Sequence, residues 1–126
     1  MSVIHRYYGL IIIGVFLGTG MFMRFHQPPM PDLADSIRVL FRSAHIYLLM
    51  SGLLNFAFGT ASDRKETVVS TIGSVFLLTA PVLIFIGFCI ESPRGVIDRP
   101  ITAMGVYLVF AGSLLRGISL WRHSTA

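Results

Sequence analysis

The chain has 126 residues, of which 54% are apolar and only 13% are charged, and its mean hydropathy is +0.75. A water-soluble domain carries roughly 25% charged residues, so the composition excludes a soluble globular domain and predicts a protein embedded in a lipid bilayer. The net charge of +4 does not indicate nucleic-acid binding, because the ten Lys and Arg residues are scattered and form no basic stripe over aromatic residues.

Ionised side chains divide the sequence into four long apolar stretches. In chain order, the charges that bracket these stretches are separated by 17, 20, 24 and 16 uncharged residues, and about 20 apolar residues cross the core of a bilayer. Because lipid offers backbone N–H and C=O groups no hydrogen-bonding partner, each stretch is predicted to be helical. The predicted helices are about 4–25, 32–61, 66–90 and 100–122.

Four crossings return the chain to the side on which it started. The predicted fold class is therefore all-α: an integral membrane four-helix bundle, antiparallel in up-down-up-down order, with both termini on the same side. Residues 1–126 are expected to form a single transmembrane domain.

The side of the membrane that holds the termini is called side A, and the opposite one is called side B. Each side carries five Lys or Arg residues, so the positive-inside rule gives a tie, and the basic termini favour a cytoplasmic side A.

Small residues at helical spacing predict where the helices pack, because they let backbones approach closely where hydrophobicity alone drives no association. Packing within one bundle is one explanation of this pattern, and packing of the first helix against another subunit is the alternative. The candidate packing residues are Gly14, Gly18, Ser70, Ser74, Gly105 and Gly112.

The second predicted helix begins with the most informative polar pattern of the sequence. Asp32 is a candidate N-cap. Asp35, Arg38, Arg42 and His45 then follow at i, i+3, i+7 and i+10, so they form one stripe along the helix. The stripe runs from side B into the membrane, where ionisable groups are costly and usually face protein or water.

Arg24 and His26 end the first helix on the same side. If the first two helices are neighbours, these groups meet the stripe and form a basic pocket with two imidazoles, to which Glu91 could supply a counter-charge. The imidazoles are candidate metal ligands. The candidate ligand-binding residues are His45, Arg42, Arg38, His26 and Arg24, and His26 and His45 are the candidate metal ligands.

Two interpretations of the stripe follow from the residues alone. In the first, Arg38 and Arg42 extend to lipid headgroups, Asp35 pairs with Arg38, and His45 bonds a neighbouring helix. In the second, the stripe binds a cofactor or an anion. The imidazoles would then ligate haem b or copper, and the arginines would neutralise propionates or phosphates.

A third interpretation is enzymatic. The segment Arg38-x3-Arg42-Ser-Ala-His45 resembles the second helix of membrane-associated glutathione-transferase-like proteins, which are four-helix trimers of similar length. The resemblance implies glutathione binding through Arg38 or Arg42. It covers less than a tenth of the chain, and the asparagine and the acid that the family carries one turn on are missing from 46–50, which reads Ile-Tyr-Leu-Leu-Met.

Other polar residues inside the predicted spans are few. Asn55 and Arg116 both lie toward side A and are expected to bond with each other, whereas His5 and His123 lie near the ends of the chain and are expected to be solvated. No carboxylate lies in the interior of a span, which disfavours ion- or proton-coupled multidrug transporters. No catalytic or nucleotide-binding motif occurs.

The sequence therefore favours a small non-enzymatic membrane protein. We expect it to act as a subunit or accessory factor of a larger membrane assembly, or as a homo-oligomer. Its partners would be the lipid bilayer and other membrane protein subunits or itself, with no nucleic acid. The alternatives are the haem-, copper- or anion-binding bundle and the glutathione-transferase-like enzyme. A compact chain without a presequence is typical of a bacterial cytoplasmic (inner) membrane protein.

Overall fold

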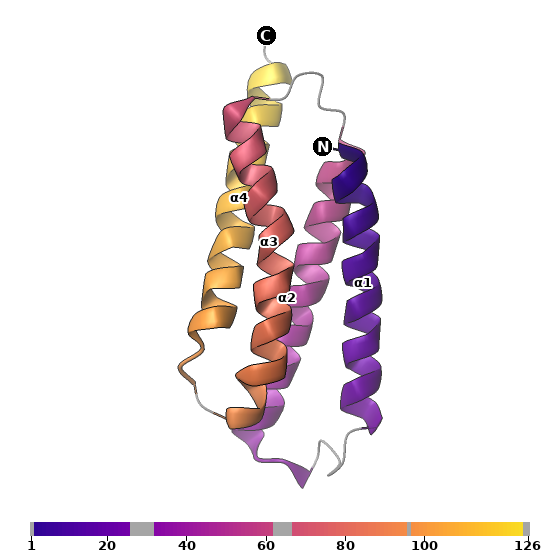
Figure 1. Ribbon diagram of the computed structural model, residues 1–126, viewed down its shortest axis with the longest axis vertical. Coiled ribbons are helices and arrows are strands. Elements are labelled where there is room, and N and C mark those ends of the chain that lie inside the picture. Colours follow the sequence, from indigo (N-terminus) through magenta and orange to yellow (C-terminus); the bar gives the residue numbers. More distant parts are fainter. Residues whose placement is uncertain (1, 26–31, 62–66, 96, 125–126) are drawn as a thin grey trace.

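The computed structural model describes residues 2–25, 32–61, 67–95 and 97–124. Within these residues the chain is all-α, and consecutive helices run in opposite directions with both termini at the same end (Figure 1). This confirms the predicted fold class. The elements are α1 (Ser2–Phe25), α2 (Asp35–Thr60), α3 (Val68–Ile90), the short 3-10 turn η2 (Ser92–Arg94) and α4 (Pro100–Ser124).

All four α-helices are long and apolar enough to cross a membrane. The shortest, α3, has 23 residues, and at a rise of about 1.5 Å per residue it exceeds the roughly 30 Å of hydrocarbon core. The chain is therefore a multi-pass membrane protein.

Two helices begin later than predicted. Asp32 is not the N-cap of α2: that position is Ala34, which has φ −53° and ψ 142° and makes no side-chain cap bond. The first turn of α2 instead contains Asp35, whose carboxylate suits the positive end of the helix dipole. Helix α3 begins after Thr67, whose side-chain oxygen accepts a hydrogen bond from the backbone N–H of Ser70 at 3.2 Å.

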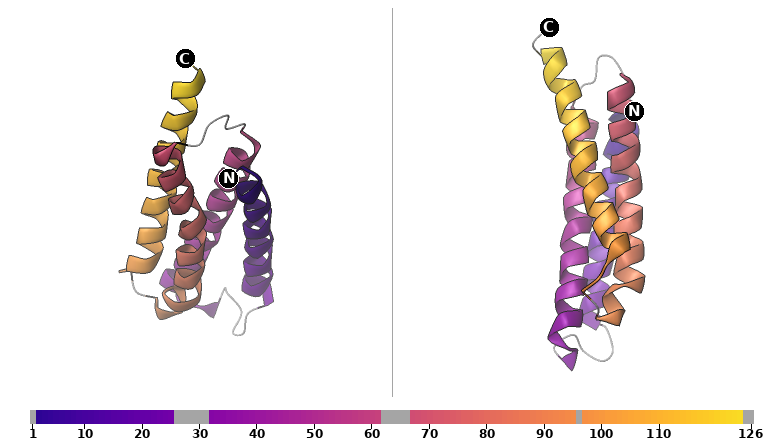
Figure 2. Two further views of the ribbon diagram at one scale, coloured as in Figure 1. Left: turned by 45° about the horizontal axis from the view of Figure 1, so that its top comes forward. Right: turned by 90° about the vertical axis from the view of Figure 1, so that its left-hand side faces the viewer.

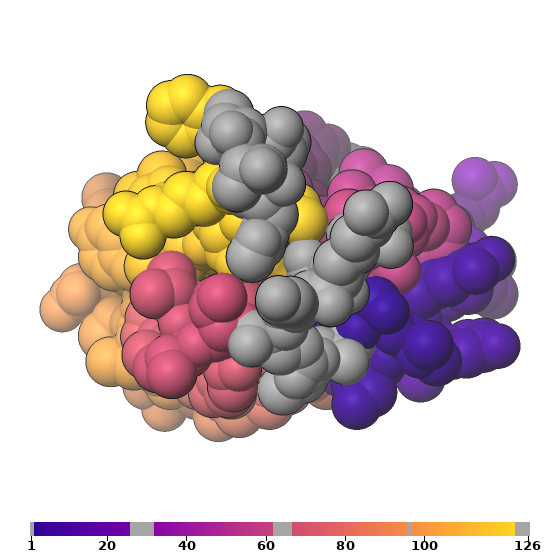
Figure 3. All heavy atoms as spheres, turned by 90° about the horizontal axis from the view of Figure 1, so that it is seen from above, coloured from indigo at the N-terminus to yellow at the C-terminus, as the bar shows by residue number. Residues whose placement is uncertain are grey.

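The bundle is made of two helical hairpins. Helix α1 packs along α2, and α3 packs along α4, whereas α2 and α3 provide most of the contact between the hairpins and α1 contacts α3 little. Seen from the end that carries the termini, α1 and α2 lie on one side and α3 and α4 on the other (Figure 3). The two further views in Figure 2 agree on the alternating directions of the helices.

Close backbone approach joins α1 to α2 at glycines. A Cβ atom at Gly9 would lie 2.5 Å from the backbone nitrogen of Phe56, and one at Gly59 would lie 2.3 Å from that of Arg6. By contrast, a Cβ at Gly14 or Gly18 would meet no atom of the described residues within 4 Å. Of the two explanations that the sequence left open for these residues, packing inside the bundle therefore does not apply to them. They lie 5 and 9 positions after Gly9, about 140° and 180° around the helix, and so face outward.

The contact between α3 and α4 is equally close. A Cβ at Gly112 would lie 2.8 Å from the carbonyl oxygen of Gly73, and one at Gly105 would lie 3.1 Å from that of Ala80. On α3, Ser70 and Ser74 are buried, and the Ser74 hydroxyl donates to the carbonyl of Ser70 at 2.9 Å. The apolar core between the helices centres on Leu48, Ala80, Ile84 and Val109, with a second cluster of Phe41, Ala44 and Phe88 toward side B.

Candidate functional site

The structure describes four of the five candidate ligand-binding residues, and His26 lies outside the described residues. Arg38 forms an ion pair with Asp35, as one interpretation of the stripe expected. Arg24 and Arg42 are exposed, and neither bonds to His45 in the described part of the chain. The structure therefore does not bring these guanidinium groups together around the imidazole.

His45 bonds a neighbouring helix, which the same interpretation expected. Its Nδ1 lies 2.8 Å from the Thr19 hydroxyl of α1, and its ring stacks on Phe16 with centroids 4.0 Å apart. The Thr19 hydroxyl donates its hydrogen to the carbonyl of Phe16 at 2.9 Å. Its oxygen therefore accepts from His45, which assigns a proton to Nδ1 and makes Nε2 the acceptor nitrogen of the neutral ring.

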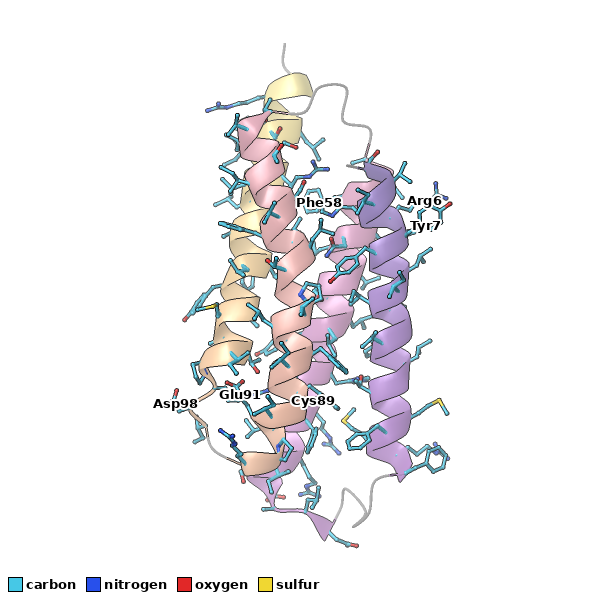
Figure 4. All side chains as sticks on the ribbon, in the orientation of Figure 1. Arg6, Tyr7, Phe58, Cys89, Glu91 and Asp98 are labelled. Atoms are coloured by element: carbon cyan, nitrogen blue, oxygen red, sulfur yellow. The ribbon has the colours of Figure 1, made fainter. Side chains whose placement is uncertain are left out.

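An apolar hollow of about 490 Å³ lies beside this pair, between α1 and α3 toward side B. Thr19 belongs to the wall of this hollow, so its hydrogen bond to His45 fixes the position of the Thr19 hydroxyl there. Cys89, which Figure 4 labels, also lies on this wall. The lining residues are Val15, Gly18, Thr19, Phe22, Phe41, Phe85, Phe88, Cys89 and Pro93.

Toward side A the structure buries a polar group that was expected to be solvated. His5 has no exposed surface, and its Nδ1 lies 2.7 Å from the Asn55 side-chain oxygen. The expectation of a solvated His5 is wrong, because His5 lies on the face of α1 that Gly9 and Ile12 turn toward α2. The side chain of His123 lies outside what the structure describes.

Asn55 connects three helices through its side chain. Its amide nitrogen donates to the carbonyl of Ser51 in α2 and to the carbonyl of Leu77 in α3, both at 2.9 Å. With both amide hydrogens used, the amide oxygen faces His5, so His5 Nδ1 is the donor in that bond. The carbonyl of Leu77 is available because Pro81, four residues on, has no N–H to offer it.

Tyr8 reinforces this connection at the next carbonyl along α3. Its hydroxyl donates to the carbonyl of Leu78 at 2.8 Å. Two side chains from the first hairpin thus bond to backbone groups that lie one turn before Pro81. In a bilayer, a helix-interior proline is tolerated where neighbouring groups satisfy the backbone in this way.

Arg116 lies on the opposite hairpin and does not bond to Asn55, contrary to expectation. Only 1% of the residue is exposed, and its Nη1 donates to the hydroxyl of Ser70 at 2.6 Å. Its guanidinium carbon also lies 5.9 Å from the ring centroid of Phe58, which stabilises a buried cation. These two contacts come from α2 and α3.

Glu91 does not supply a counter-charge to the arginine stripe. Its carboxylate accepts hydrogen bonds from the backbone N–H groups of Ile101 at 2.8 Å and Thr102 at 2.9 Å, and from the Thr102 hydroxyl at 2.6 Å. These N–H groups belong to the first turn of α4, where helices leave donors unsatisfied. Glu91 therefore caps α4 from the end of α3. The glycine at position 87 leaves room for this contact, because a Cβ there would lie 2.1 Å from the Thr102 hydroxyl.

Arg99 lies next to this cap. Its guanidinium donates to the hydroxyl of Ser43 at 2.7 Å, to that of Thr102 at 3.2 Å and to that of Ser92 at 3.4 Å. Burial lowers the pKa of Arg99 below its ordinary value, and the charge of Glu91 opposes this shift. The guanidinium of Arg99 is thus a cation whose position is fixed by three hydroxyl groups.

Sequence reasoning missed His5, Glu91 and Arg99 as structural groups. A signal was present for His5, since His5, Gly9 and Ile12 recur at the spacing of one helical face. For Glu91 and Arg99 no comparable pattern exists, because their partners come from a different helix. Among the described residues, no cluster of three or more His, Cys, Asp and Glu side chains could hold a metal ion.

A comparison of the chain with models of known protein families, with curated proteins and with solved structures finds no match.

Proposed function

We propose that this chain is a small non-enzymatic membrane protein that binds another membrane protein, or a second copy of itself, through the outer face of α1. The observation that carries the proposal is the open Gly14-x3-Gly18 pair. Nothing in the described chain lies within 4 Å of a Cβ at either position. Glycines four residues apart let a second transmembrane helix approach closely.

The rest of the bundle supports a role in assembly. On its inner face α1 already uses a glycine for close packing, at Gly9 against α2. The apolar hollow beside Gly18 continues the outer face and offers space for side chains of a partner. The inner polar groups His5, Asn55 and Glu91 are engaged in bonds that hold the helices together.

The experiment combines Gly14→Leu with Gly18→Leu and uses Gly117→Leu as the matched control. Gly117 is equally open but lies on α4. The wild type, extracted in mild detergent, is expected to migrate as an assembly in native mass spectrometry, with itself or with a co-purifying membrane protein. The double variant should lose that assembly at unchanged helical content, and Gly117→Leu should retain it. A wild-type monomer that co-purifies with nothing, or a double variant that assembles normally, would contradict the proposal.

His45 supports a second candidate function, a bundle that binds a haem, a copper ion or an anionic ligand. The specific observation is the fixed Nδ1–H tautomer, which is the arrangement that metal-ligating histidines adopt when a second group bonds the other nitrogen. An absorbance spectrum and a metal assay of freshly purified protein test this function. A Soret band or stoichiometric copper that His45→Ala abolishes would support it, and a colourless, metal-free protein would remove both cofactors.

We also propose that the chain lies in a bacterial cytoplasmic membrane with its termini in the cytoplasm. The support is the basic character of the chain ends, with Arg6 near one and Arg122 near the other. Labelling of single cysteines at residues 2 and 124 with a membrane-impermeant maleimide, in vesicles of known orientation, tests this orientation.

A further inference from the structure

A second hollow lies on the other hairpin boundary, between α2 and α4 at side B. Its volume is about 420 Å³, and its wall combines polar groups at the membrane surface with apolar groups further along α4. These two helices contact each other little, so the hollow opens between them. The lining residues are Tyr47, Ile97, Asp98, Arg99, Pro100, Thr102, Ala103, Val106 and Tyr107.

Arg99 provides a fixed positive charge in this cleft. Hydroxyl groups of Ser43, Ser92 and Thr102 hold its guanidinium in place. The carboxylate of Glu91, which lies near it, directs both oxygens to the first turn of α4. Within the described residues no carboxylate forms an ion pair with Arg99, although the nearby charge of Glu91 stabilises its cationic form. The buried Nε of Arg99 has no hydrogen-bond partner there, so the guanidinium retains a donor for an anionic group.

Asp98 provides a negative charge beside it. The residue is exposed and lines the same cleft. In Figure 4 Asp98 lies at the outer edge of the molecule, whereas Glu91 lies nearer the bundle. Asp98 makes no hydrogen bond or ion pair with the described part of the chain. An anion-binding and a cation-binding group thus line the same cleft.

The remaining wall is suited to a hydrocarbon chain. Ala103 and Val106 follow along α4, and the rings of Tyr47 and Tyr107 face the same space. Helix α4 begins at Pro100, where its membrane span also begins. The charged pair is therefore at the depth of lipid headgroups, and the apolar wall is at the depth of acyl chains.

We propose that this cleft binds one zwitterionic phospholipid. The phosphate diester binds Arg99, the ammonium binds Asp98, and one acyl chain lies along Ala103 and Val106. A headgroup with only negative charge is disfavoured, because Asp98 repels it. This site is separate from the outer face of α1, so its test and that of the assembly proposal fail independently.

The test is native mass spectrometry of the full chain with equimolar phosphatidylethanolamine and phosphatidylglycerol of identical acyl chains. The wild type is expected to retain the ethanolamine lipid preferentially. Asp98→Asn should lower the ethanolamine-to-glycerol ratio about two- to fivefold, the range that one exposed ion pair supports. Asp32→Asn is the matched control, since it removes an exposed side-B carboxylate that lies outside the cleft, and it should leave the ratio unchanged.

Three results would overturn the proposal. The first is equal or greater retention of phosphatidylglycerol by the wild type. The second is an unchanged ratio in Asp98→Asn, and the third is the same loss in Asp32→Asn. A further arm adds soluble phosphoethanolamine at the concentration of the lipid. Failure to displace the lipid supports a site that also holds the acyl chain, and displacement would show that the cleft binds the headgroup alone and contradict a lipid site.

Discussion

At the scale of single residues, the bond from Asn55 to the carbonyl of Leu77 gives the bundle its most specific internal contact. The carbonyl lacks its helical partner because Pro81 has no N–H, and no water is present in the hydrocarbon core to replace it. Asn55 also holds the buried His5. One amide therefore joins three helices.

We predict that Asn55→Leu lowers the free energy of unfolding by about 1–3 kcal/mol, because it leaves polar groups of His5 and Leu77 unsatisfied. Unfolding of the detergent-solubilised protein, followed by circular dichroism, measures the change. Thr79→Val is the control: its hydroxyl is exposed and bonds only within α3, so a change below about 0.5 kcal/mol is expected.

The contribution of the bond from Asn55 to Leu77 can be measured by combining Asn55→Leu with Pro81→Ala. An alanine at this position restores the N–H that bonds Leu77 within α3, so Asn55→Leu should be less harmful in that background. The coupling between the two changes is expected to be about 0.6–1.7 kcal/mol, as for other interhelical bonds in membranes. Strictly additive effects would show that Asn55 does not compensate for the proline.

Glu91 offers a prediction at the other end of the bundle. Glu91→Gln replaces one acceptor oxygen by an NH₂ group that faces the donors of α4, so we expect a loss of about 1–3 kcal/mol in unfolding free energy. Asp98→Asn makes the same chemical change at an exposed position and should alter stability by less than about 0.5 kcal/mol. Equal effects of the two changes on the thermal midpoint would rule out the cap.

At the scale of helices, α1 presents two glycine faces with opposite roles. Gly9 meets the backbone of α2, whereas Gly14 meets nothing in the described chain. The sequence predicted the kind of residue that packs closely but left the face of α1 open, because periodicity does not say which stripe of small residues turns inward. The positions of the charges did predict the spans, and the bounds of the helices differ from the predicted ones by three residues or fewer.

A matched pair of alanine substitutions separates the two faces. Gly9→Ala should destabilise the protein by about 1–3 kcal/mol, since its Cβ would lie 2.5 Å from a backbone nitrogen of α2. Gly14→Ala should leave stability unchanged or raise it by up to about 1 kcal/mol through helix propensity. The comparison uses unfolding of both variants in the same detergent, and an inverted order would contradict the packing of α1.

At the scale of the whole molecule, the two hairpins meet chiefly through α2 and α3, which leaves hollows on both sides of that contact. The up-down-up-down order followed from counting apolar stretches, because each crossing must be helical in lipid. The polar contacts that close the bundle did not follow. His5 with Asn55 and Glu91 with Thr102 join residues from different helices, and their pairing depends on the rotation of each helix.

The central claim is that the chain crosses the membrane four times and returns both ends to one face. Single cysteines introduced as Ser2→Cys, Ser124→Cys and Asp98→Cys, each in a Cys89→Ala background, can be labelled in sealed vesicles with a membrane-impermeant maleimide. We predict that the cysteines at 2 and 124 react from the same face, and the one at 98 from the opposite face only. Reaction of the two ends from opposite faces, or a chain that remains soluble without detergent, would contradict the account.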